Sequence, residues 1–184
     1  MLWMLDEFET ISGAKYPGFI TGKPVGMGGS LGRTEATGYG LVFTLREALK
    51  EMGVRIEDTV AAVQGFGNVA QYAIQLFSQL GGKVTCVSCW DQNDRTSYTY
   101  RKKAGISLEE LLAITDRFGG IDKVKAEALE YERLPGDAWI EQDVDILIPA
   151  ALENQVNAET VESGKAYMII AAANGPTTPG ADRL

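Results

Sequence analysis

Hydrophobic and polar positions along this chain predict helices and strands in alternation. Apolar residues at intervals of three over 1–12 predict a short helix with one buried face. Residues 13–33 are rich in glycine and proline, which predicts a long ordered loop. A second helix is predicted over 34–53, with Thr34 as its N-cap and Gly53 as its stop signal.

The middle of the chain predicts a βαβ unit. A strand-length apolar run at 59–65 leads into an amphipathic helical pattern at 68–81, and a second strand follows at 83–89. Strands that are apolar throughout and alternate with helices are typical of a parallel sheet covered on both faces. We therefore predict an α/β fold, a Rossmann-like, doubly wound, mostly parallel sheet with helices on both faces. Further helices are predicted at 107–120 and 157–164, and further strands at 144–152 and 166–173.

We expect residues 1–184 to form one domain, with an N-terminal helix and a long loop over residues 1–33. Gly38 and Gly40 stand inside the second predicted helix, where glycine is costly. They predict close backbone packing or a nearby ligand at that place.

The junction between the first strand and the next helix carries a glycine-rich motif. Residues 65–70, Gly-Phe-Gly-Asn-Val-Ala, fit the pattern G-x-G-x-x-G/A. Here Gly65 permits a tight turn, Gly67 lets a pyrophosphate reach the backbone amides, and Ala70 lets helix and strand approach closely. The helix N-terminus adds unpaired amide donors and a positive dipole end. Glycines also gather at such turns for steric reasons alone, but the strand-to-helix context favours a nucleotide site.

An acidic residue about 20 positions beyond such a turn usually holds the adenosine ribose. The residue 19 positions beyond Ala70 is Cys89, and the nearest following acid is Asp91. We take Asp91 as the candidate ribose ligand, and the alternative is that it is a solvated loop residue. The absence of a basic residue next to position 89 favours NAD over NADP, although Arg95 can still reach a 2′-phosphate.

Composition removes several classes of function. The chain has no histidine, which excludes a Ser/His or Cys/His dyad within it. Cys86 and Cys89 are three apart on a predicted strand and point to opposite faces, so we expect core or loop thiols and no metal site. A net charge of −8 disfavours nucleic acid. No apolar run approaches about 20 residues, and the first residues lack signal-peptide features, so we expect a cytoplasmic protein without a membrane partner.

Four stretches of the chain are too specific to be ordinary loops and strands. They are TGKPVGMGGSLGRTEATG at 21–38, VQGFGNVA at 63–70, DILIPAALENQ at 145–155 and ANGPTTP at 173–179. Together they resemble the nucleotide-binding domain of glutamate dehydrogenases, and the resemblance covers essentially the whole chain. The related leucine, valine and phenylalanine dehydrogenases share the fold and the glycine turn but generally lack TGKP, GGSLGR and NGPTTP.

The resemblance implies roles for residues at matching positions. It implies that residues 1–184 form one dinucleotide-binding domain in which residues 1–33 provide the N-terminal helix and a loop of the cofactor and substrate cleft. Arg33 would line this cleft, where a guanidinium suits a dianionic substrate. Thr37 lies near the nicotinamide carboxamide, and Asn174 lies beside the nicotinamide. Lys23 belongs to the TGKP motif but is given no catalytic part. The pyrophosphate turn corresponds to Gly65, Phe66, Gly67, Asn68 and Val69.

This chain also departs from the family pattern. Ala171 and Ala172 replace a Glu-Gly pair before Asn174, which changes the local polarity. Cys89 and Trp90 replace a pair that is usually small or acidic, which weakens any inference about NAD versus NADP.

The resemblance implies the reversible oxidative deamination of L-glutamate to 2-oxoglutarate and ammonia, with NAD as cofactor and NADP as the alternative. It also implies that the catalytic lysine and aspartate belong to a preceding substrate domain absent from this chain, so no catalytic residue is assigned and we expect no turnover. Family members are usually hexamers, but we expect this chain alone to be a monomer or weak dimer. The alternatives are another amino acid dehydrogenase of the superfamily or a non-catalytic dinucleotide-binding module.

Overall fold

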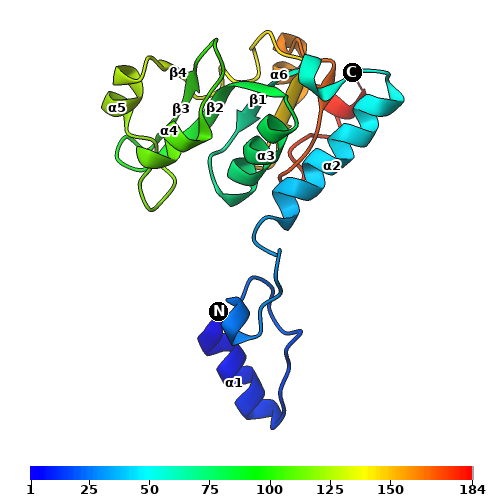
Figure 1. The fold of residues 1–184 in the computed structure, drawn as a ribbon, viewed down its shortest axis with the longest axis vertical. Helices are drawn as coiled ribbons and strands as arrows, with labels where there is room; N and C mark the ends of the chain where they lie inside the picture. Colours follow the sequence, from blue (N-terminus) through cyan, green and yellow to red (C-terminus); the bar gives the residue numbers. More distant parts are fainter. Residues whose placement is uncertain (184) are drawn as a thin grey trace.

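The computed structural model describes residues 1–183, which form a sheet with packed helices and a separate N-terminal segment. That segment, drawn in blue in Figure 1, projects away from the sheet and contains α1 (Leu2–Ser12) and the 3₁₀ turn η1 (Val25–Met27). The predicted first helix is confirmed, and Gly13 ends it in the left-handed conformation at φ 66°. The expected buried face is wrong, because no residue of α1 is buried and Trp3 is 91% exposed.

Six strands form one sheet in the order β4-β3-β2-β1-β5-β6 among the described residues. The α/β fold is confirmed, but the sheet is mixed. Three neighbouring pairs are parallel (β1 with β2, β1 with β5, β5 with β6), and the pairs β2–β3 and β3–β4 are antiparallel. The strands are β1 (Val60–Gln64), β2 (Lys83–Asp91), β3 (Thr96–Arg101), β4 (Glu132–Pro135), β5 (Ile146–Pro149) and β6 (Met168–Ile169).

The region between β2 and β5 differs most from the prediction. The predicted helix at 107–120 is too long, because α4 covers only Leu108–Ala113. The chain then forms a turn in which Asp116 Oδ1 accepts from the amides of Phe118 and Gly120. A further helix, α5 (Lys123–Ala128), begins after Asp122, whose side chain caps it. The antiparallel strands β3 and β4 complete this region and were not predicted.

Helices α2 (Ala36–Glu51) and α3 (Asn68–Gln79) pack side by side. The predicted close packing at Gly38 is confirmed, because a Cβ built there would lie 2.7 Å from the carbonyl oxygen of Val69. Gly40 has no such neighbour within 4 Å. The predicted cap is wrong, because the residue before α2 is Glu35 and makes no capping bond with its side chain. Gly53 does follow the helix end, at φ 69°.

The two faces of the sheet are covered differently. One face packs against α2, α3 and α4, so the prediction of helical cover is confirmed there. The other face is covered mainly by irregular segments that include Trp139 and Val156, with α6 (Ala158–Ser163) contributing Val161. Cys86 lies in this second cluster and Cys89 in the first, as the alternation of a strand requires. No helix of residues 1–183 is long and apolar enough to cross a membrane.

Candidate functional site

The carboxyl end of β1 is the topological switch point of the sheet, because the neighbouring parallel strands β2 and β5 lie on either side of it. In open α/β sheets, ligands bind in the crevice at such a point. The amide of Gly65 donates to the carbonyl of Ser88 on β2 at 2.6 Å, and the amide of Ala150 donates to the carbonyl of Gln64 at 2.9 Å. The glycine turn is therefore fixed between the ends of both neighbours.

The two glycines of the turn have different reasons to lack a side chain. Gly65 has φ +96°, and a Cβ there would lie 2.9 Å from the Cβ of Ala151, so the protein itself requires glycine. Gly67 has φ −81° and ψ −171°, which any residue adopts, and a Cβ there would meet nothing within 4 Å. The missing side chain at Gly67 leaves open space above the backbone and is not explained by packing.

The open space adjoins the start of α3. Gly67 is the N-cap of this helix and makes no side-chain capping bond. The amides of Asn68, Val69 and Ala70 donate no hydrogen bond within residues 1–183. Such unpaired amides and the positive end of the helix dipole favour an anion. A diphosphate fits both the charge and the open space of this turn.

The loop before α2 reaches the same place. The Asn68 side-chain amide donates to the carbonyl of Thr34 at 2.7 Å. Arg33 Nη1 donates to Thr37 Oγ1 at 3.4 Å, and both residues are exposed. The structure therefore brings Arg33, Thr37 and Asn68 together beside Gly67. The exposed side chains of Arg33 and Thr37 are free to turn toward a ligand.

The side chains of Phe66 and Val69, the other predicted residues of the turn, point toward the protein interior to different degrees. Phe66 is 2% exposed and packs in the core on the α3 side of the sheet, so only its backbone faces the turn. Val69 is half-buried on α3.

Asn174 lies at the same edge of the sheet but farther along it. It is exposed in the loop after β6, two strands away from β1. That loop is tied to the loop after β5, because the amide of Asn154 donates to the carbonyl of Gly175 at 3.0 Å and Val156 bridges to Thr177. No contact joins Asn174 to the glycine turn in the described part of the chain.

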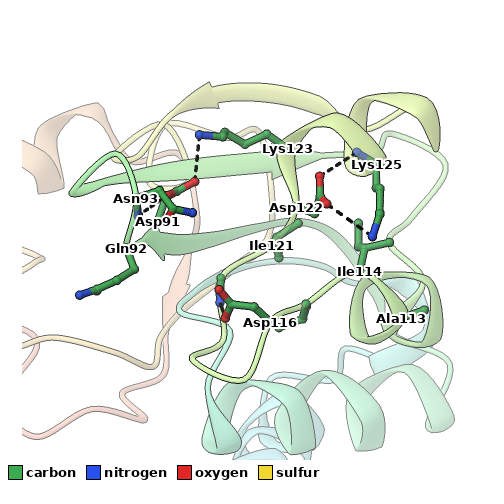
Figure 2. Close-up of a pocket in the computed structure, with 12 residues that line it drawn as sticks. Asp91, Gln92, Asn93, Ala113, Ile114, Asp116, Ile121, Asp122, Lys123 and Lys125 are labelled. Carbon is green, nitrogen blue, oxygen red and sulfur yellow. Dashed lines mark hydrogen bonds and ion pairs between the residues drawn. The ribbon is translucent and has the colours of Figure 1, made fainter.

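Asp91 is already engaged by its own surroundings. Its Oδ1 accepts from the amides of Asn93 at 2.8 Å and Asp94 at 3.0 Å, and its Oδ2 lies 3.1 Å from Lys123 Nζ. Both residues line a pocket of about 430 Å³ beside the loop before α5, and Figure 2 shows the Asp91 carboxylate and the Lys123 amine pointing toward each other there. The backbone amide of Asp94, with Lys123 and the amide of Asn93, holds the pKa of Asp91 below its usual value despite burial. Asp91 is thus the last residue of β2, paired with Thr96 of β3, and its carboxylate is bonded to the turn that follows and to Lys123.

A second cavity, which the sequence did not indicate, lies between the carboxyl ends of β2 and β5. It has a volume of about 450 Å³ and is bordered by Gly65, Trp90 and Leu152. Gln64, at the end of β1, also lines it and donates through Nε2 to Gln155 at 2.7 Å. The buried Oε1 of Gln64 has no donor within residues 1–183. Two features of the sequence fall at this place, the glycine motif at Gly65 and the unusual Cys-Trp pair at 89–90, but neither by itself indicated a cavity.

Lys23 has a structural position in the N-terminal segment. It is 6% exposed, and its amine donates to the carbonyls of Pro17, Phe19 and Ile20. Three backbone acceptors satisfy the ammonium donors inside this loop. Its place in the TGKP motif is therefore explained by loop structure.

Fold and site define an open α/β protein with a glycine turn and unpaired helix amides at the switch point of its sheet. Residues 28–184 match the family model of the Glutamate/Leucine/Phenylalanine/Valine dehydrogenases, and the chain belongs to this family of oxidoreductases. The resemblance drawn from the four motifs is thereby confirmed.

Individual relatives agree with this assignment. The chain is 40% identical to the NAD-specific glutamate dehydrogenase of Clostridioides difficile, over 100% of this chain and 42% of that protein. It is 38% identical to the NAD-specific glutamate dehydrogenase of Peptoniphilus asaccharolyticus, over 100% of this chain and 43% of that protein. The solved glutamate dehydrogenase of Plasmodium falciparum matches with a TM-score of 0.84 at 27% identity, over 98% of this chain and 39% of that one. The chain thus spans less than half the length of these relatives.

Proposed function

We propose that this chain is the Rossmann-like nucleotide-binding part of a glutamate dehydrogenase and that it binds NAD. The observation that carries the proposal is the open space above Gly67 beside the uncapped start of α3. An anion with two phosphates would satisfy the unpaired amides there. The relatives from Clostridioides difficile and Peptoniphilus asaccharolyticus are both NAD-specific, which favours NAD as the nucleotide.

The chain's own residues would hold and orient the dinucleotide. The amides of Asn68, Val69 and Ala70 bind the diphosphate, and the Asn68 side chain holds the loop of Thr34 against the turn. The exposed guanidinium of Arg33, beside Thr37, provides a fixed positive charge for a carboxylate of the substrate. Thr37 is proposed to lie near the nicotinamide carboxamide, and Asn174, at the same edge of the sheet, is proposed to lie beside the nicotinamide ring. When bound, the nicotinamide supplies the hydride acceptor for the substrate's α-carbon.

In the whole enzyme we propose the reversible oxidative deamination of L-glutamate to 2-oxoglutarate and ammonia. We assign no catalytic residue to this chain, which has no histidine and whose exposed site residues are binding groups. Hydride transfer needs both carbons held in contact within a closed cleft, and these residues form one wall of it. We therefore expect the purified chain to show no turnover and to be a monomer or weak dimer.

The proposal is tested by titrating the purified chain with NADH and NADPH while following nucleotide fluorescence. We expect saturable NADH binding and no glutamate-dependent formation of NADH from NAD. Absence of binding of either nucleotide at millimolar concentration contradicts the nucleotide-binding role. A measurable glutamate-dependent rate contradicts the expected lack of turnover. Sedimentation velocity tests the expected association state.

A further inference from the structure

The adenosine end of the proposed site lacks the usual ribose ligand. The position of the usual acid is occupied by Cys89, which is 5% exposed and packs in the core. The carboxylate of Asp91 is engaged by Lys123 and by two turn amides. Neither residue therefore offers a free carboxylate to the ribose hydroxyls.

Trp90 stands between these two residues and faces the opposite side of the sheet. Side chains alternate along a strand, so Trp90 shares a face with Ser88 and lines the cavity beside Gly65. The indole is 53% exposed, and its Nε1 donates to Gln92 Oε1 at 3.1 Å. An aromatic surface is thus held in place at the end of β2 and is open to a ligand.

The cavity has the size and the lining of a site for a mostly apolar group such as a base. Its other side is formed by Ala151 and Leu152, which follow β5. Its inner end carries Gln64 Oε1, a buried acceptor without a donor in the described chain. The cavity also borders Gly65, so a ligand whose diphosphate lies at the turn can extend directly into it.

We propose that the indole of Trp90 stacks on the adenine of the bound dinucleotide and replaces the ribose carboxylate as the main adenosine contact. This inference rests on the proposed function, because it concerns the same nucleotide. Stacking on an aromatic side chain recognises the face of the base and not the ribose hydroxyls. The contact therefore contributes equally to NAD and NADP.

The test compares Trp90→Ala and Trp90→Phe with the wild-type chain by isothermal titration calorimetry. The ligands are NADH, NADPH and reduced nicotinamide mononucleotide, which lacks the adenosine half. We expect Trp90→Ala to raise the Kd of NADH and NADPH by the same factor, about tenfold. The mononucleotide should bind unchanged, and Trp90→Phe should stay near wild type because it retains an aromatic face. Trp3→Ala, on the separate N-terminal segment, is the matched control.

The outcomes separate this inference from the proposed function. If Trp90→Ala binds NADH as tightly as wild type does, the stacking role is overturned and the nucleotide site stands. If Asp91→Asn weakens NADH but not NADPH, the ribose is read by Asp91 and the inference is again overturned. AMP serves as a further ligand. If the wild-type chain binds neither dinucleotide, the proposed function fails, and weaker binding of AMP by Trp90→Ala would then show that the indole holds an adenine but not that of a dinucleotide.

Discussion

Gly38 on α2 lies so close to Val69 on α3 that a Cβ at position 38 would stand 2.7 Å from the Val69 carbonyl oxygen. The same Cβ would stand 2.7 Å from the backbone nitrogen of Ala73. Because these are backbone atoms within a helix, they cannot turn aside as the end of a long side chain can. The contact sets the spacing of α2 and α3 and with it the position of Thr37 beside the start of α3.

Replacement of Gly38 by alanine is expected to lower the free energy of unfolding by about 1–3 kcal/mol, the usual cost of overpacking. The measurement is urea denaturation followed by circular dichroism. Gly40→Ala is the matched control on the same helix, because a Cβ there meets nothing within 4 Å. It should raise stability by up to about 1 kcal/mol through helix propensity. Equal stability of the two variants would contradict the close-packing explanation.

The Asp91–Lys123 pair predicts a pH-dependent contribution to stability. The pKa of Asp91 is lowered in the folded chain by the amide of Asp94 and by Lys123, so its contribution is present above the unfolded pKa. It is lost as the pH falls through the folded pKa. At pH 7, Asp91→Asn should lower the free energy of unfolding by about 1–3 kcal/mol, because bonds to a charged acceptor are weakened. The difference from wild type should shrink toward pH 3.

The control for this experiment is Asp143→Asn. Asp143 is exposed and makes no side-chain hydrogen bond within residues 1–183. Its substitution should change stability by less than about 0.5 kcal/mol at either pH. A loss in Asp91→Asn that is the same at pH 7 and pH 3 would show that packing, and not the charge, is responsible.

The two cysteines are expected to be unreactive while the chain is folded. Burial raises the pKa of Cys86 to about 12 and that of Cys89 to about 11, so little thiolate exists at pH 8. Ellman's reagent should therefore react slowly with the native chain and should titrate both thiols in denaturant. Ser12→Cys, at the exposed end of α1, provides an accessible thiol for comparison. Rapid labelling of the native wild-type chain would contradict the buried positions.

The strands and helices that the sequence predicted well are those with long apolar patterns. The unit β1–α3–β2 follows such patterns, since most of β1 and the middle of β2 are continuous buried runs and α3 buries positions three and four residues apart. By contrast, β3 has the sequence Thr-Ser-Tyr-Thr-Tyr-Arg, with no apolar run, and it is a strand because β2 and β4 pair with it. Pairing of this kind depends on tertiary contacts that periodicity does not contain.

In the candidate site, too, features set by local spacing were predicted and features set by tertiary contacts were not. The glycine turn was visible in the sequence because its spacing is local. The reason for Gly65 was not visible, because it depends on Ala151, which comes near only through the pairing of β1 with β5. Asp91 was singled out by counting positions, yet its partner Lys123 is supplied by α5, a helix that the sequence did not predict.

The difference between the two turn glycines gives the sharpest test of the nucleotide site. Gly67→Ala should fold, because φ −81° and ψ −171° suit alanine and the Cβ points into open space. Loss of glycine at the N-cap should cost no more than about 1 kcal/mol. The new methyl group would occupy the space proposed for the diphosphate, so the Kd for NADH should rise about tenfold or more, since a displaced charged contact is worth about 1.5–3 kcal/mol.

Gly65→Ala should behave in the opposite way, because its Cβ would clash with Ala151 and its φ of +96° strains any other residue. Its free energy of unfolding should fall by about 2–4 kcal/mol from strain and overpacking together. Thermal unfolding and an NADH titration on both variants separate the two effects. A Gly67→Ala chain that binds NADH with wild-type affinity would show that the open space above this glycine does not hold the diphosphate, and a Gly65→Ala chain of wild-type stability would show that Ala151 can move away.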